Sequence, residues 1–159
     1  MEIQPNRIIW HHSADASTRY QFEGINQYHK TRGFPKSSLG FYVGYHYLVE
    51  YDGTIRKARK DTEIGAHDKD ENYGSIGICL AGHFGINKPS AAQAEAAAQL
   101  VDELIIKWNV PITRIDPHRW NDSTDCPGRL LGDYWLVLEY LNRKVGWLRR
   151  TLLKMQLPK

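Results

Sequence analysis

The chain has 159 residues, of which 42% are hydrophobic and 25% are charged, a composition typical of one soluble globular domain with a sizeable core. Its net charge of +3 is too small to indicate a nucleic-acid partner. The sequence contains no run of about 18 apolar residues, so no transmembrane segment is predicted. The first residues contain neither a basic region nor a long apolar region, so we expect no secretory signal peptide and synthesis in the cytoplasm.

The first half of the chain predicts one strand, one helix and one hairpin. Residues 7–13 are rich in branched and aromatic side chains and are expected to form a strand. Residues 20–32 carry apolar side chains at helical spacing, and Gly33 is expected to end that helix. Residues 41–59 predict a β-hairpin whose tight turn is Asp52-Gly53.

The second half predicts a buried strand, a long helix and a further short strand. Residues 75–82 form an apolar run that includes Cys79 and is typical of a central strand. Ser90 and Gln93 predict a capping box that opens a helix ending at about Asn109. Residues 112–116 predict a short strand. Because strands and helices alternate, we expect a single α/β domain with a central mixed β-sheet flanked by helices.

The C-terminal residues 137–159 are predicted to form a basic amphipathic helical extension of a domain that comprises residues 1–136. This last helix is expected to begin near Leu130, with apolar residues recurring every three or four positions from Trp135. The apolar stripe comprises Leu138, Leu141, Val145, Leu148, Leu152 and Met155, whereas Arg143, Lys144, Arg149, Arg150 and Lys154 lie largely off it. Two alternatives stay open: the stripe packs on the domain or on a second copy, or the basic face binds an anionic cell-envelope surface.

The segment "DPHRWNDSTDCPG" (116–128) places His118 and Cys126 in a polar stretch with a proline near each end. Histidine nitrogen and cysteine thiolate are common zinc ligands, and three protein ligands plus water form a typical catalytic site. The third ligand is expected from "HHS", where His11 and His12 point to opposite faces of a strand. The alternation does not decide between them, and packing in an ordinary core would explain the same residues.

Five segments, taken in order, resemble one protein family. They are "IIWHHSA", "INQYHKTRGF", "VGYHYLVEYDGTI", "GAHDKDENYGSIGICLAG" and "PHRWNDSTDCPG". Over about residues 7–136 the chain resembles the zinc-dependent N-acetylmuramoyl-L-alanine amidases found in phage lysozymes and in animal peptidoglycan recognition proteins. The resemblance implies that the chain binds one Zn2+ and acts on peptidoglycan.

The resemblance also implies which residues form the site. It makes His11, His118 and Cys126 the metal ligands, and it places Tyr45 beside the metal as a catalytic residue. Thr124 is a second catalytic candidate. Some phage enzymes of the family carry lysine at its position, whereas catalytic peptidoglycan recognition proteins carry threonine. The hydroxyls of Tyr45 and Thr124 are expected to stabilise the negative charge that develops on the substrate carbonyl.

Further polar residues receive different interpretations. His67 and Asn72 match a loop that the family places near the substrate cleft, and the resemblance implies that they bind substrate. His29 is expected to pack beside its helix, His46 to be structural, and His83 to lie in a solvated loop.

The activity implied is hydrolysis of the amide bond between N-acetylmuramic acid and L-alanine by a phage-type endolysin. Without a signal peptide, such a protein would reach the cell wall through a separate membrane-permeabilising protein. Two alternatives are a cytosolic amidase that recycles muropeptides and a peptidoglycan-binding module without catalysis. The complete ligand set together with Tyr45 favours an enzyme.

Overall fold

The computed structural model describes residues 3–156, with side chains described as far as Thr151. The strands are β1 (Arg7–His12), β2 (Tyr47–Val49), β3 (Ile55–Lys57), β4 (Ser75–Leu80) and β5 (Ile115–Pro117). They form one sheet in the order β3-β2-β4-β1-β5, in which only the β2–β3 pair is antiparallel. The predicted single α/β domain with a mixed sheet is therefore confirmed.

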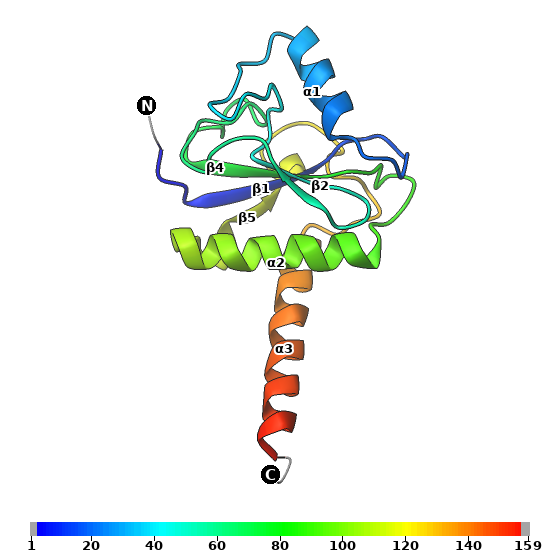
Figure 1. The fold of residues 1–159 in the computed structure, drawn as a ribbon, viewed down its shortest axis with the longest axis vertical. Coiled ribbons are helices and arrows are strands. Elements are labelled where there is room, and N and C mark those ends of the chain that lie inside the picture. The colour runs from blue at the N-terminus through cyan, green and yellow to red at the C-terminus, as the bar shows by residue number, and fades with distance from the viewer. Residues whose placement is uncertain (1–2, 157–159) are drawn as a thin grey trace.

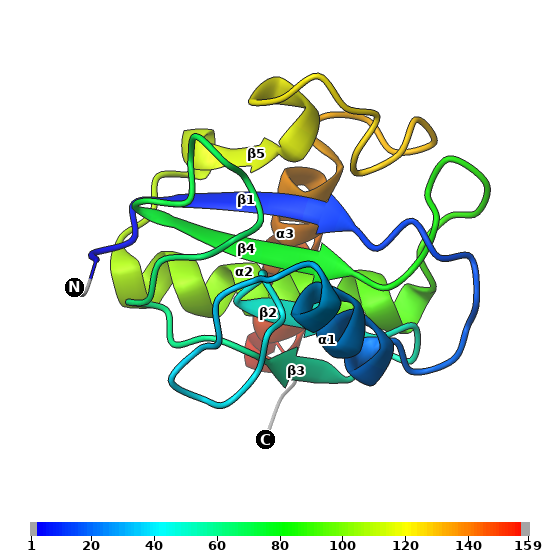
Figure 2. The ribbon, with the colours of Figure 1, turned by 90° about the horizontal axis from the view of Figure 1, so that it is seen from above.

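Two helices cover opposite faces of the sheet, and a third projects from the body of the molecule (Figures 1 and 2). The helices are α1 (Phe22–Thr31), α2 (Ala91–Trp108) and α3 (Trp135–Gln156), with 3-10 turns at Ile112–Arg114 and His118–Trp120. None of the helices within the described part of the chain is long and apolar enough to cross a membrane.

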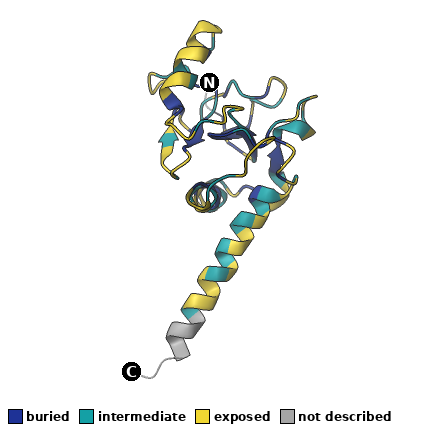
Figure 3. Ribbon diagram, turned by 90° about the vertical axis from the view of Figure 1, so that its right-hand side faces the viewer, coloured by how far each residue is buried: buried dark blue, intermediate teal, exposed yellow. Residues whose placement is uncertain are grey.

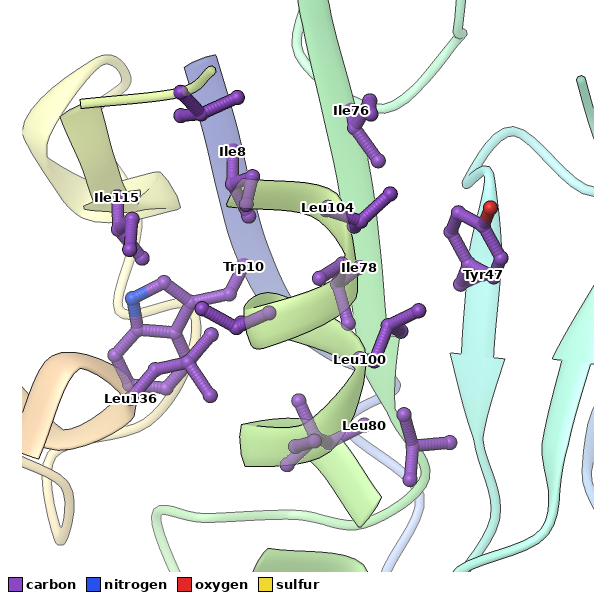
Figure 4. Packing of buried hydrophobic residues seen from close by; sticks show 14 of the residues in the cluster. Ile8, Trp10, Tyr47, Ile76, Ile78, Leu80, Leu100, Leu104, Ile115 and Leu136 are labelled. Carbon is purple, nitrogen blue, oxygen red and sulfur yellow. The ribbon is translucent and has the colours of Figure 1, made fainter. Parts of the chain in front are cut away.

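The sheet divides the core into two clusters. Even-numbered residues of the central strands, such as Ile8 and Trp10, pack against α2 (Figure 4). Cys79 belongs to the cluster on the opposite face, together with Phe22 at the start of α1. His11 pairs with Cys79 in the β1–β4 register. Side chains alternate along a strand, so His11 faces the α1 side of the sheet while its neighbours enter the α2 side.

The predicted hairpin is shorter than residues 41–59. Its strands are β2 and β3, and Gly53, with φ of +88°, ends the turn between them. Residues 41–46 are not a strand, because side chains and loop residues bond much of their backbone, although the His46 N–H does donate to the Gly77 carbonyl of β4 (2.9 Å). The Gly44 N–H donates to His29 Nδ1 (3.0 Å), and the Val43 carbonyl accepts from Arg59 Nε (2.8 Å).

Helix α2 begins after Ser90 and ends before Asn109, close to the predicted bounds, but only half of the capping box forms. The Ser90 hydroxyl accepts from the Gln93 N–H (3.0 Å). The Gln93 side chain does not return the bond, because it is buried and donates to the carbonyls of Val49 and Ala81. Gln93 therefore anchors α2 to the ends of β2 and β4.

Helix α3 begins at Trp135 rather than near Leu130, and its apolar stripe faces outward. Leu136 is fully buried, and Arg143 and Lys144 form ion pairs with Asp102 of α2. The described members of the stripe, Leu138, Leu141, Val145 and Leu148, are 41–55% exposed. Figure 3 shows α3 leaving the body of the domain with exposed residues along the part of the helix whose side chains are described. The alternative in which the stripe packs on the domain is therefore wrong for these residues, whereas Leu152 and Met155 lie outside the described side chains.

Candidate metal centre

The end of β1 separates two adjacent histidines. His11 is 1% exposed and lies on the sheet face opposite α2. His12 belongs to different surroundings, because its Nδ1 accepts from the Phe84 N–H (3.1 Å). The His12 backbone N–H donates to Cys126 Sγ (3.4 Å). The strand thus directs one imidazole into the candidate site and a backbone donor to the cysteine beside it.

The other two residues come from the segment after β5. His118 follows that strand directly, in a 3-10 turn. The loop then folds back, and the Arg119 N–H donates to the Cys126 carbonyl (2.9 Å). The Arg119 guanidinium donates to the carbonyls of Gly128 and Leu131. These bonds hold His118 and Cys126 together although eight positions separate them.

His11, His118 and Cys126 gather into one cluster. One ligand atom from each lies within 4.8 Å of the other two, and Cys126 Sγ is 3.8 Å from His11 Nδ1. Tetrahedral zinc with bonds of roughly 2.0–2.3 Å would space its ligand atoms by about 3.5 Å. Both ring nitrogens of His118 are buried without a hydrogen-bond partner within the described chain. The donor set and its spacing therefore fit a zinc ion.

The surroundings set the protonation of the three ligands. Burial lowers the pKa of His11 well below its usual value and also lowers the pKa of His118. Both imidazoles are therefore neutral at pH 7, with a lone pair available for a cation. Burial raises the pKa of the Cys126 thiol to about 12, so a metal ion must displace its proton.

Tyr45 and Thr124 lie beside this cluster, as expected. The Tyr45 ring centroid is 5.1 Å from that of His11. Burial raises the pKa of Tyr45 well above its usual value, so its hydroxyl stays protonated and can donate a hydrogen bond. Thr124 Oγ1 accepts from the Cys126 N–H (3.2 Å), which leaves its own proton available. Their roles in catalysis stay predictions.

The loop that contains His67 and Asn72 contacts the cluster at His11. His67 Nδ1 lies 3.1 Å from His11 Nε2. Asn72 Oδ1 accepts from the backbone N–H groups of His67 (2.8 Å) and Asp68 (3.1 Å). Substrate binding by His67 and Asn72 stays a prediction, while their contacts connect them to the candidate ligands.

Asp68 is a residue of this region that the sequence did not single out. Its side chain is 2% exposed and its Oδ2 lies 3.9 Å from His118 Nε2. In the printed sequence it stands in the charged run "HDKDEN", where a carboxylate normally faces solvent. Neither spacing nor composition distinguishes it from Asp70 two positions later.

The remaining histidines satisfy backbone donors away from the cluster. His29 Nδ1 accepts from Gly44 (3.0 Å), His46 Nδ1 from Gly77 (3.0 Å) and His83 Nδ1 from Gly85 (3.2 Å). These contacts agree with the structural roles expected for His29 and His46 and with a loop position for His83.

A mixed α/β sheet with two histidines and a cysteine clustered beside the end of its interior strand β1 defines a class of protein with a candidate three-ligand metal centre. Residues 2–129 match the N-acetylmuramoyl-L-alanine amidase family, and the chain belongs to this family. The resemblance stated from the five sequence segments is thereby confirmed.

Similar proteins agree with this assignment. The endolysin of Escherichia phage T7 is 31% identical over 117 residues, which are 70% of this chain and 72% of the phage protein. Peptidoglycan-recognition protein SC2 of Drosophila melanogaster is 31% identical over 76% of this chain, which spans 66% of the fly protein. Among solved structures, the N-acetylmuramoyl-L-alanine amidase LysC from Clostridium intestinale superposes with a TM-score of 0.70 at 30% identity, covering 80% of this chain and 78% of LysC.

Proposed function

We propose that this protein is a zinc-dependent amidase that cleaves the bond between N-acetylmuramic acid and L-alanine in peptidoglycan. The observation that carries the proposal is the cluster of His11, His118 and Cys126, whose ligand atoms lie within 4.8 Å of one another. Membership of the amidase family supports the choice of bond.

In this proposal the metal and the nearby side chains have separate roles in the reaction. A zinc ion at the site would act as a Lewis acid and would lower the pKa of a coordinated water to about 7. The protonated hydroxyl of Tyr45 donates a hydrogen bond to the substrate carbonyl oxygen as negative charge develops there. Thr124 contributes a second hydroxyl donor next to Cys126.

Product identification on purified sacculi tests the reaction. Digestion should release free amino groups of L-alanine without new reducing sugar ends. New reducing ends would instead indicate a glycosidase, and new D-amino-acid termini would indicate an endopeptidase. The Cys126→Ser variant is the matched control, because it should leave the substrate intact.

The biological setting that we propose is that of a phage-type endolysin acting on the cell wall after release by a separate membrane-permeabilising protein. Similarity to the endolysin of phage T7 supports this setting. A cytosolic muropeptide-recycling amidase would turn over soluble muropeptides faster than intact sacculi, whereas an endolysin should prefer sacculi. A non-catalytic binding module would retain sacculi without releasing amino groups.

We also propose that α3 binds an anionic phospholipid surface of the cell envelope. Its outward-facing stripe includes Leu141 and Leu148, and Arg149 and Arg150 beside it are exposed. An amphipathic helix with these two features binds at a membrane interface by inserting apolar side chains while its cations meet lipid phosphates. A second copy fits less well as the occupant, since two basic tails would repel each other.

A further inference from the structure

Two consecutive residues, His67 and Asp68, each face a different histidine of the candidate metal centre. We propose that Asp68 positions His118 and that His67 positions His11, so that one loop orients both imidazole ligands. This inference rests on the proposed zinc centre. It assigns to Asp68 a role that the sequence did not suggest, and to His67 a role at the metal in place of substrate binding.

The contact between His67 and His11 defines the tautomers of both rings. His11 Nδ1 faces Cys126 Sγ at 3.8 Å, so its lone pair is the one available to the ion. His11 Nε2 must then carry the proton and donate to His67 Nδ1 at 3.1 Å. His67 Nε2 carries the second ring's proton and lies 3.5 Å from the Ser75 oxygen, while the Ser75 hydroxyl donates to the Glu71 carbonyl.

The chain leaves a shaped space for the His67 ring. A Cβ atom added at Gly77 would lie 2.4 Å from His67 Cδ2, and one added at Gly65 would lie 2.5 Å from the same atom. Contacts this short do not occur between real side chains, so any larger residue at either position would displace the ring. Glycine at both positions therefore keeps His67 against His11.

Asp68 is placed to act on His118 in the same way. Its Oδ2 and both ring nitrogens of His118 are buried without a hydrogen-bond partner among residues 3–156. The distance of 3.9 Å from Oδ2 to His118 Nε2 exceeds a hydrogen bond by about 1 Å, a shift that a small rotation of the ring supplies. A proton held on Nε2 by this carboxylate leaves the Nδ1 lone pair for the ion. Carboxylates commonly orient metal-binding histidines in this manner.

A second carboxylate provides a comparison. Asp122 Oδ2 also lies 3.9 Å from His118 Nε2, but its side chain is 60% exposed. Water competes with and screens an exposed carboxylate, whereas Asp68 is 2% exposed and held by the loop. Asn72 accepts from the backbone N–H groups of both His67 and Asp68 and so fixes the two residues relative to each other.

Zinc affinity of the full-length protein, measured by competition with a chromophoric chelator, tests the proposal. Asp68→Ala should weaken zinc binding by about 10–100-fold, the usual effect of removing a group that orients a ligand. Asp68→Asn keeps the size and one acceptor oxygen, so its affinity should fall between those of Asp68→Ala and the wild type. Asp122→Ala, the control at equal distance, should change the affinity by less than about threefold. His67→Phe keeps an aromatic ring without its nitrogens and should weaken binding as Asp68→Ala does.

The absorption spectrum of the Co2+-loaded protein provides a second measurement, because its visible bands report ligand geometry directly. These bands should change in Asp68→Asn and stay unchanged in Asp122→Ala. Wild-type affinity in both Asp68 variants, or equal losses in the Asp68 and Asp122 variants, would overturn the role of Asp68. Wild-type affinity in His67→Phe would overturn that of His67. If Asp68→Ala does not fold, Asp68→Asn carries the test. Failure of the wild-type protein to bind zinc would instead contradict the proposed metal centre.

Discussion

His11 Nδ1 and Cys126 Sγ lie 3.8 Å apart although 115 positions separate the two residues in the sequence. One comes from the interior strand β1 and the other from the loop that follows β5. The cluster therefore exists only when the sheet has formed, and binding of a metal ion should stabilise the folded chain.

Substitution of Cys126 by serine should remove most of the zinc and nearly all of the amidase activity. Serine lacks the soft thiolate that zinc prefers, and two imidazoles alone make an incomplete site. Elemental analysis of the purified variant measures the metal content. His12→Ala is the control and should retain zinc, because the His12 ring accepts a hydrogen bond from the Phe84 N–H and is not one of the three candidate ligands. Full zinc content in Cys126→Ser would refute the assignment of this ligand.

Tyr45→Phe should lower kcat by about 10²–10³-fold, because one donor to the developing oxyanion is lost. The ring packing beside His11 is kept, so the zinc content should equal that of the wild type. Initial rates of amino-group release from sacculi check this expectation. Wild-type rates in Tyr45→Phe would leave the metal and Thr124 as the groups that stabilise the oxyanion.

Asp61 should make the stability of the fold depend on acidic pH. Burial raises the pKa of its carboxyl, but hydrogen bonds from Lys107, Lys57, Tyr47 and Trp108 outweigh this effect and lower the pKa below its usual value. A pKa depressed in the folded state stabilises the protein above about pH 4, the unfolded value, and this contribution is lost as the pH falls further.

Asp61→Asn should therefore lower the free energy of unfolding by about 2–3 kcal/mol at pH 7, because a buried charge-assisted network is broken. Its stability should also change less than that of the wild type between pH 5 and pH 2. Urea denaturation at several pH values measures both effects. Parallel pH profiles for the two proteins would show that Asp61 does not titrate in this way.

Binding of α3 to phospholipid should depend on both its apolar stripe and its exposed arginines. Replacing Leu141 and Leu148 together by serine should reduce cosedimentation with vesicles of anionic phospholipid at every salt concentration. Replacing Arg149 and Arg150 by glutamine should reduce it mainly at low ionic strength, because salt screens attraction between exposed charges.

Ile106→Ser on α2 is the control for these variants, since it removes an apolar side chain that is 73% exposed but lies outside the stripe. It should bind vesicles as the wild type does. Zinc content and hydrolysis of soluble muropeptides should remain unchanged in every α3 variant. Undiminished vesicle binding by the Leu141/Leu148 variant would exclude the stripe as the contact, and a change in oligomeric state would point to a second copy.

The elements that sequence predicts well are those whose neighbours lie close in the chain or share a simple period. The strands β1 and β4 were predicted from their apolar runs, and the start of α2 was predicted from the cap at Ser90. The predicted bounds differ from those of the structure by only a few residues. Residues 41–46 were wrongly predicted as strand, because several of their backbone groups bond side chains instead, among them those of His29 and Arg59. No local pattern indicates such partners.

Side-chain direction is the other quantity that sequence determines poorly. The alternation along β1 shows that His11 and His12 face opposite sides of the sheet. Only the resemblance to a family identified His11 as the candidate metal ligand. The stripe of α3 was recognised, but its outward direction depends on how Arg143 and Lys144 meet Asp102 of α2. Asp68 was not predicted as a site residue, because nothing in the pattern of a charged run shows that one of its carboxylates is buried.

The pairing of His11 with Cys79 and of His12 with Leu80 makes the length of β1 intolerant of change. Deleting one residue early in the strand would exchange its two faces, so His12 would replace His11 at the cluster and Trp10 would leave the core. The largely exposed segment that follows, residues 14–20, lies outside this register and can accept insertions. Variation in length among functional derivatives of this chain should therefore be confined to the loops, with β1 constant.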